Sequence, residues 1–408
     1  MNEKDLFGLA LGLASPWYIE KVEFNAEGKR LDLFLNFTKG SRFPCPECKE
    51  PSPVYDTTER TWRHLDFFQH QAYLTARVPR SNCPKCGVKQ VAVPWARPDS
   101  GFTLLFEALL VRFGREMPVA AAAALASIGP MVLWRILGHY VDKGVHDQDI
   151  TGVRAVGIDE CSKQKGQKYI TTFCDLDKSR VIYVADGRES KTVDEFVGHI
   201  ENKGLTPDHI KDVCADMWPA YLSGVEKNLP GATVTYDRYH VMTYVNKAVD
   251  EVRRHEAKVN SALKDTRYIW LKNPENLTAK QQIKLKSIKE QDLETVRAYS
   301  IRLAIQKLWE FDNLKAAREY LDRCLSWASH SKLKPMVELA QFIRRHEDGI
   351  LRSLRNRITN GIVEGINSKI KTALKRAYGF KSFDYYRTII YLVAGKLKFQ
   401  QTYSKGTL

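Results

Sequence analysis

The chain has 408 residues, which is enough for two to three domains at about 150 residues each. Hydrophobic residues make up 44% and aromatic residues 11%, so the chain can bury enough apolar surface to offset its conformational entropy, which excludes a mainly disordered protein. The 63 Lys and Arg residues outnumber the 48 Asp and Glu residues and give a formal net charge of +15. This excess favours a polyanion such as nucleic acid as partner, because each cation that neutralises a phosphate releases counterions. An inert basic surface is the alternative.

The longest uncharged run, Met117 to Trp134, is rich in alanine and is interrupted by Gly129 and Pro130. It therefore makes a poor bilayer span. The amino-terminal residues Met1 to Asp5 also lack the basic region of a secretion signal. We expect a cytoplasmic protein with no membrane partner.

Four of the eight cysteines form two closely spaced pairs, Cys45 with Cys48 and Cys83 with Cys86. A gap of two residues lets both thiolates of a pair turn toward one ion, and the nearby Pro and Gly residues favour the tight turn that this requires. The pattern predicts one structural Zn2+ with four thiolate ligands. A redox role and a disulfide are the alternatives, and neither suits a non-secreted chain with two such pairs. Strand-like stretches between the pairs predict that the intervening loop carries its own β-structure.

Residues 94 to 101 contain prolines and a glycine and are typical of a linker. Three helices are predicted after it, near residues 102–115, 118–127 and 130–143. This layout is compatible with a helix-turn-helix, whose last helix would present Arg135 and His139 to a DNA groove. The apolar residues of the same helix are equally compatible with an ordinary helical bundle.

From Gly152 onward the pattern changes to strands. Short apolar runs at 153–158, 169–174 and 180–185 predict a three-stranded meander. Predicted helices near 192–203 and 219–228 then alternate with strands at 210–215 and 232–236. This alternation indicates a mixed α/β sheet covered by helices. Residues 241–357 are predicted to be helical almost throughout and to form an all-helical insertion.

Three acidic residues occupy positions that suit catalysis. Asp159 is predicted to end the first strand of the meander, and Asp216 to end the strand after the first crossover helix. If the first and fourth strands are adjacent, both residues meet at the edge where α/β sheets bind ligands. Glu364 lies on the polar face of a helix whose apolar face, with Val363, would pack on the sheet. Three such carboxylates can hold two Mg2+ or Mn2+ ions for phosphodiester cleavage. Other acidic residues near strand ends remain rivals: Glu160, Asp175, Asp186 and Asp237.

The chain resembles the ISL3-family insertion-sequence transposases over nearly its full length. The resemblance rests on the paired cysteines and on four further blocks, of which the last is the most specific: Gly157-Ile-Asp-Glu160, Val213-Cys-Ala-Asp216, Tyr236-Asp-Arg-Tyr-His-Val241, and Asn360-Gly-Ile-Val-Glu-Gly-Ile-Asn367 running to Phe380. Tyr239 is a mild departure, since the family usually has Phe at that position.

The resemblance implies a DDE enzyme with an RNase H-like catalytic domain. Its catalytic triad falls on Asp159, Asp216 and Glu364, which would hold two Mg2+ or Mn2+ ions per active site. Asp237 and His240 match a family motif that positions DNA, supports the metal site or forms a structural Asp-His hydrogen bond. Besides Arg135, His139 and His240, the residues expected to bind DNA are Arg355, Arg357, Lys369, Lys371, Lys375 and Arg376. Expected partners are the terminal inverted repeats and target DNA, with a homodimer or higher oligomer acting at the bacterial nucleoid.

The expected fold class is α/β: an RNase H-like mixed sheet with an all-helical insertion, preceded by a zinc-binding module and a helix-turn-helix-like segment. The expected domains are a zinc-binding domain (1–98), a helical DNA-binding segment (99–150), the first part of the catalytic core (151–240), the helical insertion (241–357) and the second part of the core (358–408). Two alternatives stay open: a nuclease of the same fold that does not join DNA, and a non-catalytic zinc-dependent regulator.

Overall fold

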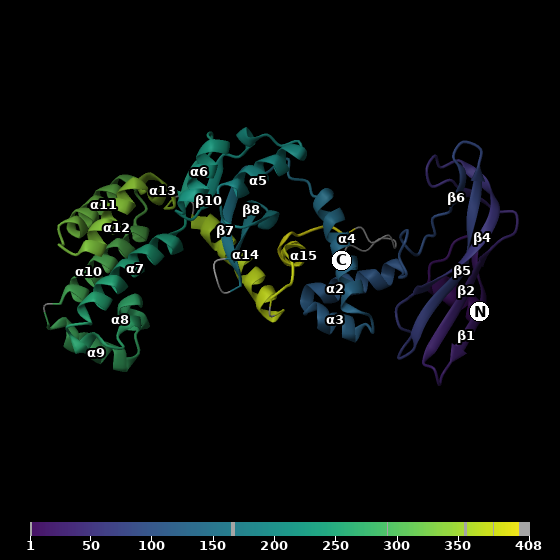
Figure 1. Ribbon diagram of the computed structural model, residues 1–408, viewed down its shortest axis with the longest axis horizontal. Helices are drawn as coiled ribbons and strands as arrows, with labels where there is room; N and C mark the ends of the chain where they lie inside the picture. The colour runs from purple at the N-terminus through teal and green to yellow at the C-terminus, as the bar shows by residue number, and fades with distance from the viewer. Residues whose placement is uncertain (1, 165–167, 292, 355–356, 378, 400–408) are drawn as a thin grey trace. The chain divides into compact units, whose positions relative to one another are not determined.

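The computed structural model describes residues 2–164, 168–291, 293–354, 357–377 and 379–399 (Figure 1). These residues form two compact units. The first contains the chain up to Gly144 together with Lys398 and Phe399, and the second contains Val145–Leu397.

The first unit begins with a short helix and a sheet of six strands. Helix α1 spans Glu3–Ala10, and the strands are β1 (Trp17–Asn25), β2 (Arg30–Phe37), β3 (Arg42–Pro44), β4 (Pro51–Arg63), β5 (Gln71–Cys83) and β6 (Gly87–Gln90). The strand order is β1-β2-β5-β4-β3, and β6 pairs with β5. Strands β4 and β5 form the long hairpin between the two cysteine pairs, so the predicted β-structure of this loop is confirmed. Alternate residues of β2, including Leu31, Leu33 and Leu35, are buried in the core of the sheet.

The segment predicted as a linker is in fact packed against this sheet. Trp95 is 1% exposed, and its ring contacts the rings of Trp17 and Trp62 at 4.9 and 5.7 Å between centroids. Its carbonyl accepts a hydrogen bond from the backbone of Leu104. The prolines and glycine of the segment shape a turn, but the buried tryptophan fixes it, which a composition-based prediction of a linker misses.

Three helices complete the first unit: α2 (Leu104–Glu116), α3 (Val119–Leu125) and α4 (Pro130–His146), the last of which ends across the unit boundary. Their bounds agree with the predicted ones within a few residues. Helix α4 buries Leu133, Ile136 and Leu137 against the other helices. Its contact with α2 is close, because a Cβ atom on Gly114 would lie 2.8 Å from Cδ1 of Leu137.

A buried carboxylate ties this helical segment together. Glu107 of α2 is completely buried and accepts hydrogen bonds from Ser100 Oγ at 2.7 Å, from Tyr140 Oη at 2.8 Å and from Arg97 Nε at 3.0 Å. A buried charge with three donors has its desolvation offset, so α2, α4 and the preceding turn are held in one arrangement.

Among the described residues, no single helix is long and apolar enough to cross a bilayer. Helices α3 and α4 pass the test of length and composition only when taken as a pair, and they are bent by 110° relative to each other.

The second unit contains a five-stranded mixed sheet. Its strands are β7 (Ala155–Gln164), β8 (Lys168–Asp175), β9 (Arg180–Asp186), β10 (Asp212–Ala215) and β11 (Thr233–Tyr236), in the order β11-β10-β7-β8-β9. Strands β7, β8 and β9 form the predicted antiparallel meander, while β10 runs parallel to β7 and to β11. The first and fourth strands are therefore adjacent, which meets the condition set for bringing Asp159 and Asp216 together. Three antiparallel strands followed by two parallel ones in this order form the RNase H-like sheet.

Helices cover both faces of this sheet (Figure 1). On one face, α5 (Lys191–Asn202) and α6 (Pro219–Asn228) pack on a core that includes Val156, Ile158 and Phe173. On the other face lies α14 (Arg357–Arg376), whose Val363 packs against Cys214 and Leu176. Helix α15 (Phe383–Ala394) packs against α14 and β9.

A helical insertion separates β11 from α14, as expected from the sequence. It contains α7 (Arg238–Glu256), α8 (Arg267–Leu271), α9 (Ala279–Lys289), α10 (Glu294–Gln306), α11 (Leu314–Ser329), α12 (Lys334–Arg345) and α13 (Glu347–Arg352), with short 3-10 turns between some of them. Trp270, Tyr299 and Leu325 are fully buried in its own core. Its contact with the sheet is close, because Gly349 packs against the ring of Tyr236 and leaves no room for a Cβ atom there.

Candidate active site and zinc site

The four paired cysteines lie together at one end of the first sheet. Their sulfur atoms all lie within 4.8 Å of one another, and Cys48 Sγ is 3.5 Å from Cys83 Sγ. The two turns have the same backbone shape, since the residue after each pair has a positive φ, 63° at Lys49 and 76° at Gly87. A positive φ causes no strain at Gly87 but does at Lys49. The Lys49 turn is held by two backbone hydrogen bonds, from Lys49 to Cys45 and from Cys45 to Glu50.

This donor set fits zinc. In a tetrahedral site with Zn–S distances of about 2.3 Å, the sulfur atoms are about 3.8 Å apart, which agrees with the spacing found here. All eight cysteines are free thiols in the structure. Four sulfur atoms in so small a space would repel one another as thiolates, and a divalent cation between them removes that repulsion.

The two aspartates of the predicted triad lie on adjacent parallel strands. Cys214 of β10 is in register with Gly157 of β7. Two residues further along the chain in each case, this alignment brings Asp216, which directly follows β10, beside Asp159 of β7. Side chains two residues apart point to the same face of a sheet, so both carboxylates face the side that α14 covers.

One prediction about this region was wrong in detail. Asp159 does not end its strand, because β7 continues to Gln164 in the hairpin with β8. Only Ala155, Val156 and Gly157 of β7 are paired with β10, and Asp159 lies two residues beyond that paired part. Asp216 directly follows β10. The edge at which the two carboxylates meet is thus the end of the parallel part of the sheet.

Helix α14 brings Glu364 to the same region. Val363, the residue before it, packs against Gly157 so closely that a Cβ on the glycine would lie 2.8 Å from Val363 Cγ2. The predicted apolar face of the helix is confirmed, since Val363, Ile366 and Ile370 are buried. Glu364 is exposed on the neighbouring face. By contrast, a Cβ on Gly365 would meet nothing within 4 Å.

Asp159 and Glu364 line one cavity of about 490 Å³. Its other lining residues are Glu160, Asp237, Tyr239, His240, Asn367, Ser368, Lys371, Thr372 and Lys375. Asp216 is connected to it through His240, whose ring lies between the aspartates: Nδ1 is 3.4 Å from Asp216 Oδ2 and Nε2 is 3.8 Å from Asp159 Oδ1. Among the described residues, only the four cysteines form a group of three or more His, Cys, Asp or Glu side chains whose ligand atoms lie within 4.8 Å of one another. The carboxylates therefore surround an open space instead of forming a closed cage.

Asn367 is the contact that sequence reasoning missed. Its side chain is 4% exposed and its Nδ2 donates a hydrogen bond to Asp159 Oδ2, while its Oδ1 is buried with no partner among the described atoms. Asn367 and Glu364 lie on the same helix, α14. The spacing of three residues between them, one helical turn, is the signal that could have identified it as a neighbour of the aspartate.

Burial and like charges act on the carboxyls of this cavity. Burial raises the pKa of Asp159 above its ordinary value, against the attraction of His240 and Lys371. Burial also raises the pKa of Asp237, and the charges of Glu364 and Asp216 add to that rise. Converging carboxylates that are held above their ordinary pKa gain from a cation among them. The hard oxygen donors therefore fit Mg2+ or Mn2+.

Each of the rival acidic residues has a partner of its own, although Glu160 and Asp237 also line the cavity. Asp175 is buried in an ion pair with Arg180, and Asp186 pairs with Lys163, so both serve the sheet. Asp237 caps α7 by accepting a hydrogen bond from the backbone of Tyr239. Glu160 lines the cavity beside Asp159, and its carboxylate lies 3.9 Å from the guanidinium group of Arg188.

The residues expected to contact DNA are distributed over both units. Arg135 and His139 are exposed on α4, on the side away from its buried residues. Lys369, Lys371, Lys375 and Arg376 are exposed on α14. Lys371 and Lys375 line the carboxylate cavity. Arg355 lies outside the described residues, and for Arg357 the structure describes only its place at the start of α14.

Comparisons with known proteins agree with this architecture. The ISL3 family model described as "Transposase" matches residues 156–390. A model for the zinc-finger of transposases IS204/IS1001/IS1096/IS1165 matches residues 41–91, and one for the helix-turn-helix domain of transposase family ISL3 matches residues 91–141.

Curated relatives match over almost the whole chain. The transposase for insertion sequence element IS1557 of Mycobacterium tuberculosis is 29% identical over 94% of this chain and 93% of its own length. The transposase for IS1001 of Bordetella parapertussis is 25% identical over 92% of this chain and 95% of its own length.

An RNase H-like sheet with clustered carboxylates, preceded by a zinc ribbon and a helix-turn-helix, defines a DNA-binding transposase. The chain belongs to the ISL3 family of transposases, because the family model covers more than half of its length. Its cysteine cluster and the matching zinc-finger model support a structural zinc ion.

Proposed function

We propose that the chain is a DDE transposase that binds the terminal inverted repeats of its own insertion sequence, cleaves the DNA there and joins the freed ends to target DNA. The observation that supports this most directly is the register of β10 on β7, which sets Asp216 beside Asp159 on the face that carries Glu364. The proposed domains are the zinc-binding domain (1–98), the helical DNA-binding segment (99–150), the first part of the catalytic core (151–240), the helical insertion (241–357) and the second part of the core (358–408). The protein would act on DNA in the bacterial cytoplasm.

Asp159, Asp216 and Glu364 are the residues that would hold two Mg2+ or Mn2+ ions. Divalent cations bound there would activate the attacking oxygen and neutralise the charge that develops on the phosphate. Asn367 orients the Asp159 carboxylate by donating a hydrogen bond to it. The contacts of His240 favour a role at the two aspartates over a contact with DNA.

The lysines of α14 are proposed to hold the DNA backbone beside the carboxylates, as Lys371 and Lys375 line the same cavity. The zinc ribbon and the exposed face of α4 would bind the repeats. Because two ends must be joined, a dimer or higher oligomer on DNA is part of the proposal.

The test uses the full chain, Mg2+ and a labelled duplex that carries one end of the element. Asp159→Asn, Asp216→Asn and Glu364→Gln keep the size of each side chain, and each should abolish cleavage while DNA affinity is unchanged. Asp208→Asn, at an exposed position of a 3-10 turn, is the matched control and should retain activity. Full cleavage by all three variants would exclude this triad, and a wild-type chain that binds the duplex but does not cleave it would favour a non-catalytic regulator.

A second assay separates a transposase from a nuclease of the same fold. Pre-cleaved end DNA is incubated with a target plasmid, and only an enzyme that joins DNA yields covalently linked products. Cleavage without linked products would favour the nuclease.

A further inference from the structure

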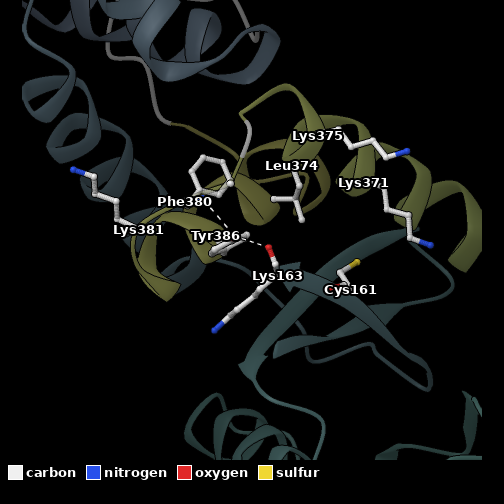
Figure 2. Close-up of a pocket in the computed structure, with 10 residues that line it drawn as sticks. Cys161, Lys163, Lys371, Leu374, Lys375, Phe380, Lys381 and Tyr386 are labelled. Atoms are coloured by element: carbon white, nitrogen blue, oxygen red, sulfur yellow. Dashed lines mark hydrogen bonds between the residues drawn. The ribbon is translucent and has the colours of Figure 1, made fainter. Parts of the chain in front are cut away.

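A second cavity lies beside the first, along the carboxyl-terminal half of α14 (Figure 2). Its volume is about 730 Å³, which is within the range of about 300–1,000 Å³ that is common for ligand sites. Lys371 and Lys375 line both cavities, so the second continues directly from the carboxylates. Neither the proposed triad nor its expected metal ions use it.

The inner wall of this cavity is apolar and firmly held. Tyr386 of α15 is 3% exposed, and its hydroxyl donates a hydrogen bond to the carbonyl of Lys163 at 2.9 Å and accepts one from the backbone of Phe380 at 3.3 Å. The ring of Phe380 stands edge-on to that of Tyr386, with centroids 4.9 Å apart. Figure 2 shows Leu374 and the sulfur of Cys161 on the opposite side of the same space. Two aromatic rings with aliphatic neighbours form a surface suited to a flat apolar group.

The rim of the cavity is cationic. Lys371, Lys375 and Lys381 are exposed, and within the described part of the chain no carboxylate lies within 4 Å of their ammonium groups. Lys163 differs, because its ammonium group pairs with Asp186 and lies 4.9 Å from the ring centroid of Phe383. Three positive charges around an apolar space are complementary to a ligand that has a flat apolar part and negative charges.

A nucleotide has this chemistry. We propose that this cavity receives an unpaired nucleotide of the DNA, next to the phosphodiester bond that is cleaved, with its base against Phe380 and its phosphates on the rim lysines. The inference rests on the proposed function, because the shared lysines place the nucleotide beside the carboxylates. Stacking on an aromatic ring accepts any base, so the cavity favours unpaired over paired DNA more than one sequence over another.

Another cavity of the same unit is a less suitable binding site for an unpaired base. It has a volume of about 570 Å³ and is lined by residues that include Glu364, Trp309 and Arg238. The guanidinium group of Arg238 already lies over the Trp309 ring, at 5.3 Å from its centroid. A base could stack there only after displacing that cation.

Photocrosslinking tests the proposal. The full chain is bound to duplexes that carry 5-iodouracil at one position at a time around the cut site, and the crosslinked peptides are identified by mass spectrometry. The expected crosslinks lie in the peptide that contains Phe380, at one or two positions beside the cut.

Phe380→Leu should reduce the yield of these crosslinks about tenfold, since an aromatic stack contributes roughly 1–3 kcal/mol. Phe311→Leu, the same change in the helical insertion, should not affect it. Crosslinks in the peptide of Trp309, or crosslinks near Phe380 that Phe380→Leu leaves unchanged, would overturn the proposal.

A binding measurement tests the rim without relying on cleavage or on the aromatic substitution. Lys381→Gln changes an exposed side chain and should weaken binding to a duplex with a short unpaired thymine tail several-fold, while binding to the blunt duplex stays the same. Lys334→Gln, at another exposed lysine, should change neither affinity. An equal effect of Lys381→Gln on both duplexes would overturn the proposal. If the wild-type chain cleaves end DNA but shows neither result, this inference fails and the proposed function stands.

Discussion

Gly157 and Val363 are in direct contact, and the missing side chain of the glycine is what permits it: a Cβ there would lie 2.8 Å from Val363 Cγ2 and 2.9 Å from Leu176 Cδ2. The contact joins β7 to α14. Asp159 follows Gly157 by two residues on the strand, and Glu364 follows Val363 on the helix. The separation between the sheet and the helix at this point therefore sets the distance across the proposed active site.

Gly157→Ala should move α14 away from β7. Overpacking of this kind costs about 1–3 kcal/mol, and we expect slower cleavage together with a lower melting temperature. Val363→Ala makes room for the new methyl group, so the double variant should recover part of the lost activity. Single-turnover cleavage rates and thermal unfolding of the four proteins in this cycle provide the measurement.

Gly198→Ala is the matched control for this cycle. Gly198 lies in α5, where a Cβ would meet nothing within 4 Å, so the change should stabilise the helix by up to about 1 kcal/mol and leave cleavage unchanged. Wild-type cleavage by Gly157→Ala would show that the close contact does not control the site.

The zinc site should hold one ion per chain. Cys83→Ser removes one of four ligands from a site formed by two turns at the end of the β4–β5 hairpin. We expect loss of the ion, unfolding of the turns and a large drop in affinity for the terminal repeat, because the free energy of metal binding in such modules is folding free energy. Elemental analysis and a DNA-binding titration measure both effects. Cys324→Ala, in the core of the insertion, should keep a full complement of zinc, and a zinc-loaded Cys83→Ser protein would contradict the four-thiolate site.

The fold was largely predictable because its signals are local. Cysteine spacing, short apolar strands and helix boundaries each depend on a few neighbouring residues, whereas the adjacency of the first and fourth strands was only a condition of the prediction and is supplied by the structure. The position of Asp159 in the middle of β7 was not predictable in this way. Strand β7 extends past Asp159 because Ser162 and Gln164 pair with Tyr169 and Lys168 of β8, beyond the parallel part of the sheet.

The details of the candidate site depend on contacts between residues far apart in the chain. Asn367 reaches Asp159 only because α14 packs on β7, and the whole helical insertion lies between β11 and that helix. The same holds for Trp95, whose burial depends on the sheet that precedes it. Sequence patterns identify the polar face of a helix, but they do not show which side chain of that face contacts a given strand.

His240 should affect cleavage more than DNA binding. Its ring separates the carboxylates of Asp159 and Asp216, and without it they face each other across a partly buried space, where like charges are costly. We expect His240→Ala to cleave at least about tenfold more slowly and His240→Asn to recover part of the rate. Cleavage rates at saturating DNA, together with DNA affinities, measure the two effects separately. Weaker DNA binding with an unchanged rate at saturation would assign His240 to the DNA instead.

His199 should make the catalytic unit sensitive to acid. Burial, together with the positive charges of Lys203 and Arg387, lowers the pKa of His199 from 6.5 to about 4. Because the folded pKa is below the unfolded one, its contribution to stability is present above about pH 6.5 and is lost as the pH falls toward 4.

His199→Gln removes this dependence. Between pH 6.5 and about pH 4, the free energy of unfolding of the wild type should fall by about 1–2 kcal/mol more than that of the variant. Partial solvent exposure of the His199 ring keeps the difference in this range. Urea denaturation across the range gives the difference. His330→Gln, at an exposed histidine of the insertion, should follow the wild type, and parallel curves for wild type and His199→Gln would refute the prediction.

Arg135 decides between two interpretations of α4. The helix buries Leu133, Ile136 and Leu137 and leaves Arg135 exposed, so Arg135→Gln changes no packing contact of those residues and should leave the melting temperature unchanged. If α4 is a recognition helix, the variant should bind the terminal repeat more weakly. A contact with a base edge should cost about 1–3 kcal/mol and relax the preference for the repeat over random DNA. A contact with a phosphate should weaken both equally and reduce the salt dependence by about one counterion. Unchanged affinity for both duplexes at every salt concentration would mean that this arginine only solvates a helix of an ordinary bundle.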